Sequence, residues 1–403
     1  MRILFCNYEY PPLGGGGGVI NALLGKELAS RHSVTVLTSR AGDLPAEAVE
    51  GGVRVLRVPV LFRRDRAKAS MVSMLSYVLR APAAWRRHGR DGVDVINTHF
   101  VLPSGPVGDV LARRLGVPNV LSVHGGDLYD PSKLTSPHRH AILKLWVRRL
   151  ARRADAVVGQ SRNTLENLKT YFTPEIQGER IPLGIRAPSP GEADRAQYGL
   201  APDDFLLVTV GRVVARKAMH QLLAVVHEIG DPRVKLLVIG SGPVVPALQR
   251  ECGTRGLGDR VRFLGNVEET EKFRVLRMCD LFVSSSQHEG FGIVFLEAMA
   301  CGLPVVCYDF GGQTDFLSDG VTGHLPALND IEAFTARCRD LIADDDARRR
   351  MGAGNLLMVE EFFIGNCAAR YERLFERVLD ERGCGAGTDR AVPAVRRDAP
   401  CTR

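Results

Sequence analysis

The sequence is poor in aromatic residues, which make up 6% of the chain and include only two tryptophans. Its basic residues therefore lack the interleaved aromatics typical of nucleic-acid-binding surfaces, and no known nucleic-acid-binding module is present. The chain also has no run of 18 apolar residues, which is about the length needed for a membrane span. The opening stretch MRILFCNYEYPP is too short an apolar segment for a secretory signal, because Glu9 and two prolines follow at once. We therefore expect no nucleic-acid partner, no membrane span and no export signal.

A metal site is equally hard to find in the sequence. The nine cysteines are scattered without metal-ligand spacing, and Cys301 and Cys307 are too isolated to form a zinc site. An odd number of cysteines without an export signal indicates reduced thiols and a cytoplasmic protein. The acidic cluster Asp344–Asp346 resembles a metal motif, but acids followed by RRRMG are better explained as the start of a helix.

The composition is that of a globular protein, with 45% hydrophobic and 25% charged residues. A chain of 403 residues is too long for one ordinary core, so two domains are expected. The net charge of +7 permits an anionic partner, such as a nucleotide or a lipid surface, without choosing between them.

Short apolar segments alternate with helical patterns in both halves of the chain. The predicted strands are 2–8, 33–39, 93–99, 118–124 and 154–161, then 204–211, 234–242, 261–267, 279–286 and 304–312. This order predicts an α/β protein with two doubly wound, Rossmann-like domains that face each other across a cleft.

We place the domain boundaries from composition and periodicity. The first domain covers 1–185, on the acceptor side of the cleft, and the second covers 186–360, on the nucleotide side. The join is rich in proline, glycine and charge. A long helix is expected over 361–382, which could pack on either domain, including back on the first. The tail 383–403 is low in apolar residues and is predicted to be disordered.

Two common nucleotide motifs can be rejected. The glycine run Gly14–Gly18 is expected to break regular structure. It does not fit a dinucleotide-binding fingerprint, because Val19, Ile20 and Asn21 stand where the motif needs glycine or alanine. A Walker loop fails because Glu27 follows Gly25 and Lys26.

A basic loop follows the strand that ends near Val210. In GRVVARKAM, Arg212 and Lys217 flank a short segment between this strand and the next helix. Two cations and free backbone amides at a helix start can bind an anion. A solvated basic loop would show the same pattern, so both interpretations stay open at this point.

The stretch HEGFGIVFLEAMACGLPVV places one glutamate beside a glycine turn and another inside an apolar run. Gly290 and Gly292 allow a ligand to approach the backbone, and a helix is expected from Ile293 to Gly302. Glu297 then lies about one turn inside that helix. A carboxylate accepts two hydrogen bonds from a vicinal diol, so Glu297 suits a ribose and Glu289 a second sugar. Alternatively, Glu297 only complements the helix dipole.

These stretches resemble a known family. GRVVARK, HEGFGIVFLEAMACGLPVV and GGQTDFLSDGVTGHL are similar to the C-terminal domain of retaining GT-B glycosyltransferases of family four. YPPLGGGGG and HGGD are similar to its N-terminal domain, and the resemblance extends to about residue 380. It implies transfer of a sugar from a nucleotide-diphosphate sugar to a hydroxyl acceptor, which is a glycan, a lipid-linked molecule or a small molecule. It also implies retention of the anomeric configuration, no metal and no cofactor beyond the sugar nucleotide.

The resemblance assigns roles to residues on the nucleotide side. Arg212 and Lys217 match the pair that holds the donor diphosphate, and Glu297 matches the acid that binds the ribose. Glu289 matches the acid near the hydroxyls of the donor sugar. The backbone amides beside it belong to Phe291, Gly292 and Ile293.

On the acceptor side, the resemblance implies that His124 reaches the donor sugar from the first domain. The residues that match a loop closing over phosphates and acceptor are Gly15, Gly16 and Gly17. Asp127 is expected to face the acceptor. The implied mechanism breaks the bond between C1 and the diphosphate, with the acceptor attacking the same face and the leaving phosphate taking its proton.

Three stretches depart from the family pattern, at four positions. Ala218 stands where glycine is frequent, Leu183 and Arg186 stand where asparagine and aspartate are usual, and Asp315 replaces a glutamate. These departures affect the identity of sugar and acceptor more than the reaction class. The alternatives are a GT-B nucleotide-sugar epimerase and a catalytically silent nucleotide-sugar-binding protein.

Residues 61–90 combine basic and apolar character. Arg63, Arg64, Arg66 and Lys68 precede a mostly apolar stretch, and Arg86, Arg87 and Arg90 follow Trp85. Basic residues around an apolar helix suit an anionic membrane surface, which predicts a peripheral contact at the inner face of the membrane. An ordinary solvated helix is the alternative.

Overall fold

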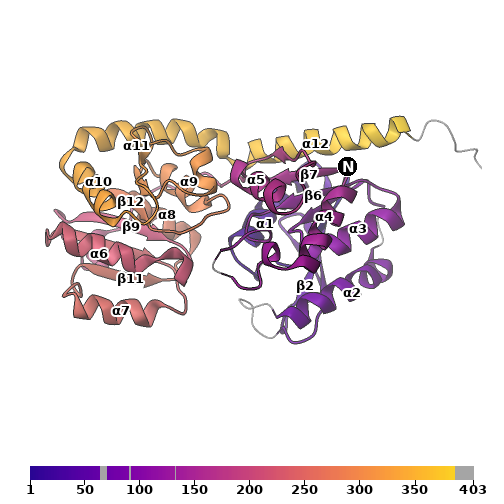
Figure 1. The fold of residues 1–403 in the computed structure, drawn as a ribbon, viewed down its shortest axis with the longest axis horizontal. Helices are drawn as coiled ribbons and strands as arrows, with labels where there is room; N and C mark the ends of the chain where they lie inside the picture. Colours follow the sequence, from indigo (N-terminus) through magenta and orange to yellow (C-terminus); the bar gives the residue numbers. More distant parts are fainter. Residues whose placement is uncertain (64–69, 90–91, 132, 386–403) are drawn as a thin grey trace, which may run out of the picture.

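The computed structural model describes residues 1–63, 70–89, 92–131 and 133–385, and it contains two parallel-sheet domains (Figure 1). The purple and magenta part of the ribbon is the first domain, and the pink and orange part is the second. This arrangement confirms the predicted fold class. Among the described residues, no helix is both long and apolar enough to cross a bilayer.

The first domain is built on an eight-stranded sheet with the order β3-β4-β2-β1-β5-β6-β7-β8. All neighbouring strands are parallel except β3, which pairs antiparallel with β4. The strands are β1 Arg2–Cys6, β2 Ser33–Arg40, β3 Glu47–Glu50, β4 Val53–Pro59, β5 Val95–His99, β6 Asn119–Val123, β7 Ala156–Gly159 and β8 Glu179–Arg180.

Helices cover both faces of this sheet. They are α1 Gly16–Ala29, α2 Met71–His88, α3 Ser104–Leu115, α4 Ala141–Arg153 and α5 Arg162–Tyr171. Ile3 and Phe5 of β1 pack in one core with α1, whereas Leu4 packs in another core with α2 and α3. Leu121 of β6 continues the second face and packs against α4. Alternation along the strands therefore places α2, α3 and α4 in one layer.

The second domain has a six-stranded sheet with the order β11-β10-β9-β12-β13-β14, in which every pair of neighbours is parallel. Its strands are β9 Phe205–Val210, β10 Val234–Ile239, β11 Val261–Gly265, β12 Leu281–Ser284, β13 Val305–Cys307 and β14 Gly323–His324. Its helices are α6 Met219–Ile229, α7 Val245–Thr254, α8 Glu269–Arg277, α9 Ile293–Met299, α10 Ile331–Ala343 and α11 Asp345–Val359.

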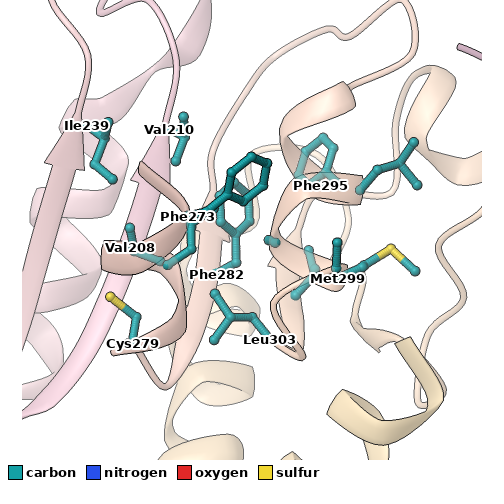
Figure 2. Close-up of a cluster of buried hydrophobic side chains, with 14 of the residues drawn as sticks. Val208, Val210, Ile239, Phe273, Cys279, Phe282, Phe295, Met299 and Leu303 are labelled. Carbon is teal, nitrogen blue, oxygen red and sulfur yellow. The ribbon is translucent and has the colours of Figure 1, made fainter. Parts of the chain in front are cut away.

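The core between this sheet and helices α8 and α9 fixes the position of α9. Figure 2 shows Phe273, Phe282 and Phe295 packed together, and the rings of Phe282 and Phe295 meet edge to face at 5.6 Å. Because Phe295 is fully buried in this core, the residues at the start of α9 are held at the carboxyl edge of the sheet.

The last helix, α12 Ile364–Gly385, returns to the first domain and lies along it (Figure 1). Tyr371 and Phe375 are buried in the core that contains Ile3 and Phe5. The two chain connections between the domains run side by side, because Ile185 N–H donates to the Phe362 carbonyl and Ile364 N–H donates to the Ile185 carbonyl, both at 2.9 Å. Of the predicted tail, 386–403 lies outside the described residues.

Two local expectations can be compared with the structure. The glycine run was expected to interrupt regular structure, yet α1 begins at Gly16 and includes Gly17 and Gly18. A Cβ at Gly18 would lie 3.0 Å from the Glu9 carbonyl oxygen, which is a tight contact, so glycine favours the close packing of the first turn of α1 on this loop. Asp344 caps α11 by accepting from Ala347 N–H at 2.8 Å, which agrees with the interpretation of this acidic cluster as a helix start.

Candidate active site

The carboxyl ends of both sheets border a cavity of about 310 Å³ between the domains. Ligands of open α/β sheets bind at this edge, because the loops there follow strands on both sides of a crossover point. The lining residues that were predicted as site residues are Gly16, Gly17, His124, Arg212, Lys217, Glu289, Phe291, Gly292 and Ile293. The structure thus brings together residues that are up to 277 positions apart, from Gly16 to Ile293.

Three charged side chains of the second domain meet at the cavity wall. Lys217 Nζ lies 2.5 Å from Glu289 Oε1, and Arg216 Nη1 lies 3.5 Å from Glu289 Oε2. Burial raises the pKa of Glu289, but the charges of Lys217 and Arg216 and hydrogen bonds from Lys217 and Ser286 outweigh it, so the pKa falls to about 2. Glu289 is therefore ionised and forms ion pairs with both nearby cations.

A short left-handed turn places Lys217 at the wall. Ala218 follows Lys217 with a φ of +45°, between the 3-10 turn Ala215–Lys217 and α6. Ser285 Oγ lies 3.0 Å from the carbonyl oxygens of both Lys217 and Ala218 and can donate to either. The alanine that departs from the family pattern thus adopts a conformation that favours glycine.

Glu297 is paired with a lysine on the neighbouring helix. Its side chain is buried on α9, and Oε1 accepts a hydrogen bond from Lys272 Nζ of α8 at 2.7 Å. Burial raises its pKa, and Lys272 opposes that rise. Glu297 is not among the residues that line the cavity, although Ile293 and Val294, one turn earlier, are.

The first domain contributes the imidazole of His124. His124 Nε2 lies 3.2 Å from Nδ1 of His99, and its ring stacks on Phe100 with 4.3 Å between centroids. Burial lowers the pKa of His124 to about 4, so the imidazole is uncharged at neutral pH. Within the described residues its Nδ1 has no hydrogen-bond partner, which leaves one ring nitrogen for a ligand.

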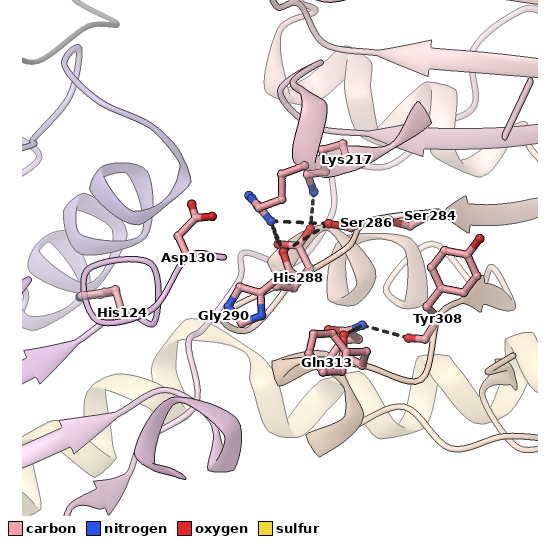
Figure 3. Close-up of polar contacts among 12 residues, drawn as sticks. His124, Asp130, Lys217, Ser284, Ser286, His288, Gly290, Tyr308 and Gln313 are labelled. Atoms are coloured by element: carbon pink, nitrogen blue, oxygen red, sulfur yellow. Dashed lines mark hydrogen bonds and ion pairs between the residues drawn. The ribbon is translucent and has the colours of Figure 1, made fainter. Parts of the chain in front are cut away.

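Asp127 has a different place from the one expected. Its two carboxylate oxygens accept from the backbone N–H groups of His124, at 2.8 Å, and Val101, at 2.7 Å. It therefore joins the loops that follow β5 and β6 and does not line the cavity. Asp130, three residues later, lies at the cavity wall instead (Figure 3).

The glycines allow close approach at two points. Gly15 caps α1 at its start, while Gly16 and Gly17 reach the cavity. A Cβ at Gly290 would lie 2.8 Å from the His124 carbonyl oxygen, so the absence of a side chain lets the backbones of the two domains approach closely there.

Hydrogen bonds hold the domains together around this contact. Ser161 Oγ donates to the Gly290 carbonyl at 2.7 Å. Asp315 accepts from Arg162 N–H at 2.9 Å and pairs with Arg180 at 3.0 Å, so this departure from the family pattern bridges the domains.

Sequence reasoning missed several residues of the cavity and its surroundings. Arg216, His288 and Asp130 line the cavity, and Lys272 pairs with Glu297. Both ring nitrogens of the buried His288 lack hydrogen-bond partners within the described residues (Figure 3). Arg216 and His288 adjoin Lys217 and Glu289 in sequence, which was a usable signal, whereas nothing in the sequence around Lys272 indicated its partner.

Two Rossmann-like domains with such a cavity define the GT-B class, and comparisons with known proteins identify the family. Residues 14–187 match Glycosyltransferase Family 4, and residues 191–355 match Glycosyl transferases group 1. The chain belongs to this family of glycosyltransferases and is a transferase enzyme.

Individual proteins show the same relationship. The chain is 29% identical over 369 residues to the GDP-mannose-dependent alpha-(1-6)-phosphatidylinositol monomannoside mannosyltransferase of Mycolicibacterium smegmatis, covering 87% of this chain and 91% of that protein. It is 30% identical over 406 residues to alpha-maltose-1-phosphate synthase of the same organism, covering 94% and 100%. Sucrose-phosphate synthase from Thermosynechococcus elongatus has the same fold, with a TM-score of 0.83, 23% identity and coverage of 94% and 100%.

Proposed function

We propose that this glycosyltransferase moves a sugar from a nucleotide-diphosphate sugar to a hydroxyl acceptor, with retention of configuration and without a metal ion. The observation that supports this most directly is the cluster of Lys217, Arg216 and Glu289 at the wall of the cavity between the domains. Fixed cations of this kind can neutralise a departing diphosphate.

Donor binding exchanges the partners of this cluster. The diphosphate takes Lys217, Arg216 and the exposed Arg212 as counter-ions, and Glu289 is released to accept hydrogen bonds from hydroxyls of the donor sugar. Because the cations are paired with Glu289 beforehand, they are already held at the cavity wall, and little reorganisation is needed when negative charge develops.

The proposed reaction balances without an added base. The bond between the sugar C1 and the diphosphate oxygen breaks, and its electron pair stays on the phosphate. The acceptor hydroxyl forms the new bond to C1 on the same face and passes its proton to the leaving phosphate oxygen. Lys217, Arg212 and Arg216 stabilise the phosphate as charge accumulates.

His124 positions the sugar from the other domain. Because its low pKa keeps the imidazole neutral, its free Nδ1 can exchange a hydrogen bond with a sugar hydroxyl without placing a cation beside the electron-deficient C1. Glu297 reaches the ribose in this proposal only if one carboxylate oxygen remains available beside Lys272.

A donor panel tests the proposal. GDP-mannose should be tried first, since one relative is named as GDP-mannose-dependent, followed by UDP- and ADP-sugars. We expect nucleoside diphosphate release in the presence of an acceptor and excess chelator, and a product whose anomeric proton coupling shows retention. An isomerised free sugar without acceptor would indicate the epimerase, and nucleotide binding without turnover would indicate a silent protein.

The proposed partners include a membrane contact through residues 61–90. Of these, 64–69 and 90 lie outside the described residues, so Arg64, Arg66, Lys68 and Arg90 are not placed. Arg63 and Trp85 were expected in this contact, but both are buried, and the Arg63 guanidinium donates to Ser39 Oγ at 2.7 Å, so neither is at the surface. Helix α2 exposes Met71, Leu75 and Leu79 at helical spacing, which is consistent with a peripheral contact.

A further inference from the structure

The helix layer α2, α3 and α4 on the outer face of the first domain carries nearly all its charge with one sign. It contains ten lysines and arginines and a single acid, Asp109, so its formal charge of +9 exceeds the +7 of the whole chain. Glu175, outside the layer, pairs with Arg148 and Arg152, which leaves the excess almost unchanged. The cations are Arg80, Arg86, Arg87, Arg113, Arg114, Lys144, Arg148, Arg149, Arg152 and Arg153.

The same layer exposes large apolar side chains. Of the 18 that are exposed in the described part of the chain, eleven belong to this layer or to the loops that lead into it. On α2, Leu79 is 71% exposed, and on α4, Ile142 and Leu145 are 73% and 65% exposed beside Trp146. Exposed apolar side chains gathered among cations mark a binding surface more often than an ordinary solvated face.

The apolar ends of α2 and α4 lie at the edge of the domain that borders the cleft. Both helices follow loops that leave the carboxyl ends of parallel strands, β4 and β6. In the loop after β6, Lys133 lines the cavity between the domains, while the next residue, Leu134, is 79% exposed. The apolar surface therefore begins next to the site where an acceptor must enter.

A second cavity adjoins α2 on the same face. It measures about 550 Å³ and lies between α2 and strands β2 to β4. Its lining includes four cations, Arg40, Arg57, Arg80 and Arg87, one acid, Glu47, and the apolar Leu79. Its size and its cations suit an anionic head group, with the apolar side chains of α2 beside it.

We propose that the layer of α2, α3 and α4 docks on an anionic membrane surface, with the apolar side chains entering the interface and the cations contacting lipid phosphates. That the acceptor is then a lipid-borne hydroxyl rests on the proposed function. Charge complementarity favours the bilayer, because an excess of +9 would be matched by the dense negative charge of an anionic leaflet.

Vesicle sedimentation tests the surface without catalysis. Phosphatidylcholine vesicles with and without phosphatidylglycerol should be compared at low and high salt. We expect binding only to the anionic vesicles, weakening as salt rises. Leu145→Gln with Trp146→Gln, and separately Leu75→Gln with Leu79→Gln, should each lower binding at least tenfold. Leu356→Gln with Leu357→Gln, on the exposed face of α11 in the second domain, is the matched control and should leave it unchanged.

Single charge removals sharpen the test. Arg149→Ala on α4 and Arg86→Ala on α2 should each lower binding about fivefold, the usual contribution of one basic residue near an anionic leaflet. Arg350→Ala on α11 is the control on the second domain and should have little effect.

Equal binding to neutral vesicles, or binding that the Leu145 and Leu75 variants leave unchanged, would overturn the proposal. Absence of vesicle binding, together with a dimer that these variants dissociate, would also overturn it and assign the surface to a second copy of the chain. Nucleotide release with a soluble acceptor is measured in parallel. If it persists while vesicles fail to bind, only the surface is refuted, and if it is absent while vesicles bind, only the proposed function is refuted.

Discussion

The two domains share one architecture but distribute charge differently around the cleft. The second domain brings Lys217, Arg216 and Glu289 into direct contact at the cavity wall. The first domain faces them with the neutral His124, with glycine backbone and with Asp130 and Lys133, whose opposite charges pair with each other, and its excess positive charge lies on the outer helices. One sheet edge is thus equipped to hold a charged diphosphate, and the other is equipped to hold uncharged hydroxyls.

The largest expected effect lies on the charged side of the cleft. Lys217→Ala should lower turnover by about 10²–10³, the usual scale for losing one preorganised stabiliser of developing charge. Donor binding should fall less, because charge grows on the phosphate as the bond breaks. Turnover and donor affinity are measured separately, and Lys235→Ala, which removes a lysine paired with Asp204, is the matched control.

Arg212→Lys should retain only part of the wild-type activity, because a guanidinium can hold two phosphate oxygens at once and an ammonium cannot. Activity should persist in excess chelator. Two results together would contradict this mechanism: activity that is lost on chelation and restored by manganese, and a Lys217→Ala variant with nearly wild-type turnover. They would show that a metal ion, and not Lys217, neutralises the leaving diphosphate.

The buried pair Glu297–Lys272 gives the second prediction. Glu297→Ala should weaken donor binding by about 1.5–3 kcal/mol if the carboxylate binds the ribose. Since the pair is buried, this change and Lys272→Ala should both lower thermal stability. Only Glu297→Ala removes the carboxylate. Titration calorimetry should therefore show a larger loss of donor affinity for Glu297→Ala than for Lys272→Ala. Equal losses in both variants would leave Glu297 with a structural role alone.

Acid titration should separate the two sides of the cleft. His124 has a pKa of about 4 when folded and 6.5 as the reference, so the unfolded chain binds more protons as the pH falls from 6.5 to 4. Stability therefore decreases on acidification in this window, by about 2 kcal/mol at pH 5 for this group. Glu289 has a folded pKa near 2, so its contribution is present above 4.5 and is lost as the pH falls toward 2.

Urea unfolding across these windows is the measurement. His124→Asn should reduce the pH dependence between 6.5 and 4, with a remainder from His99, whose pKa burial also lowers, and it should leave the lower window intact. Glu289→Gln should reduce the dependence in the lower window only. Identical profiles for both variants would show that the two sides of the cleft titrate as one unit.

The smallest expected effect concerns Ala218. A left-handed residue with a Cβ costs about 1–2 kcal/mol, and glycine loses about 0.4–1 kcal/mol more entropy on folding. Ala218→Gly should therefore stabilise the protein by about 0–1.6 kcal/mol in urea unfolding. Ala215→Gly, in the right-handed turn just before it, should instead destabilise by about 0.5–1 kcal/mol. A loss of stability in both variants would show that the left-handed conformation of Ala218 is not strained.

The elements of the fold were predictable because each has a local cause. Buried parallel strands appear as short apolar runs, such as the one that becomes β1, and glycine or proline marks their ends. The start of α1 was missed because a glycine run usually breaks a helix, whereas here the close packing of Gly18 on the Glu9 carbonyl favours glycine within the first turn. Such packing involves a neighbouring loop and has no signature in the glycines themselves.

Contacts within the candidate site were harder to predict from the sequence. The stretch around Glu289 marked a sugar site, but its pairing with Lys217 joins residues 72 positions apart and depends on how β9 and β12 lie together. Asp127 and Asp130 differ by three positions in a loop without periodicity. Which of them reaches the cavity depends on the turn that lets backbone N–H groups occupy the carboxylate of Asp127.

The return of α12 to the first domain has a consequence for synthesis on the ribosome. A growing chain that has reached residue 360 contains the whole second sheet, yet Ile3, Phe5 and Val120 still lack the helix that covers them. Tyr371 and Phe375 complete that face only when almost the entire described chain has emerged. The domain that is translated first is therefore the last to be finished, and the second domain can complete its own two cores before it.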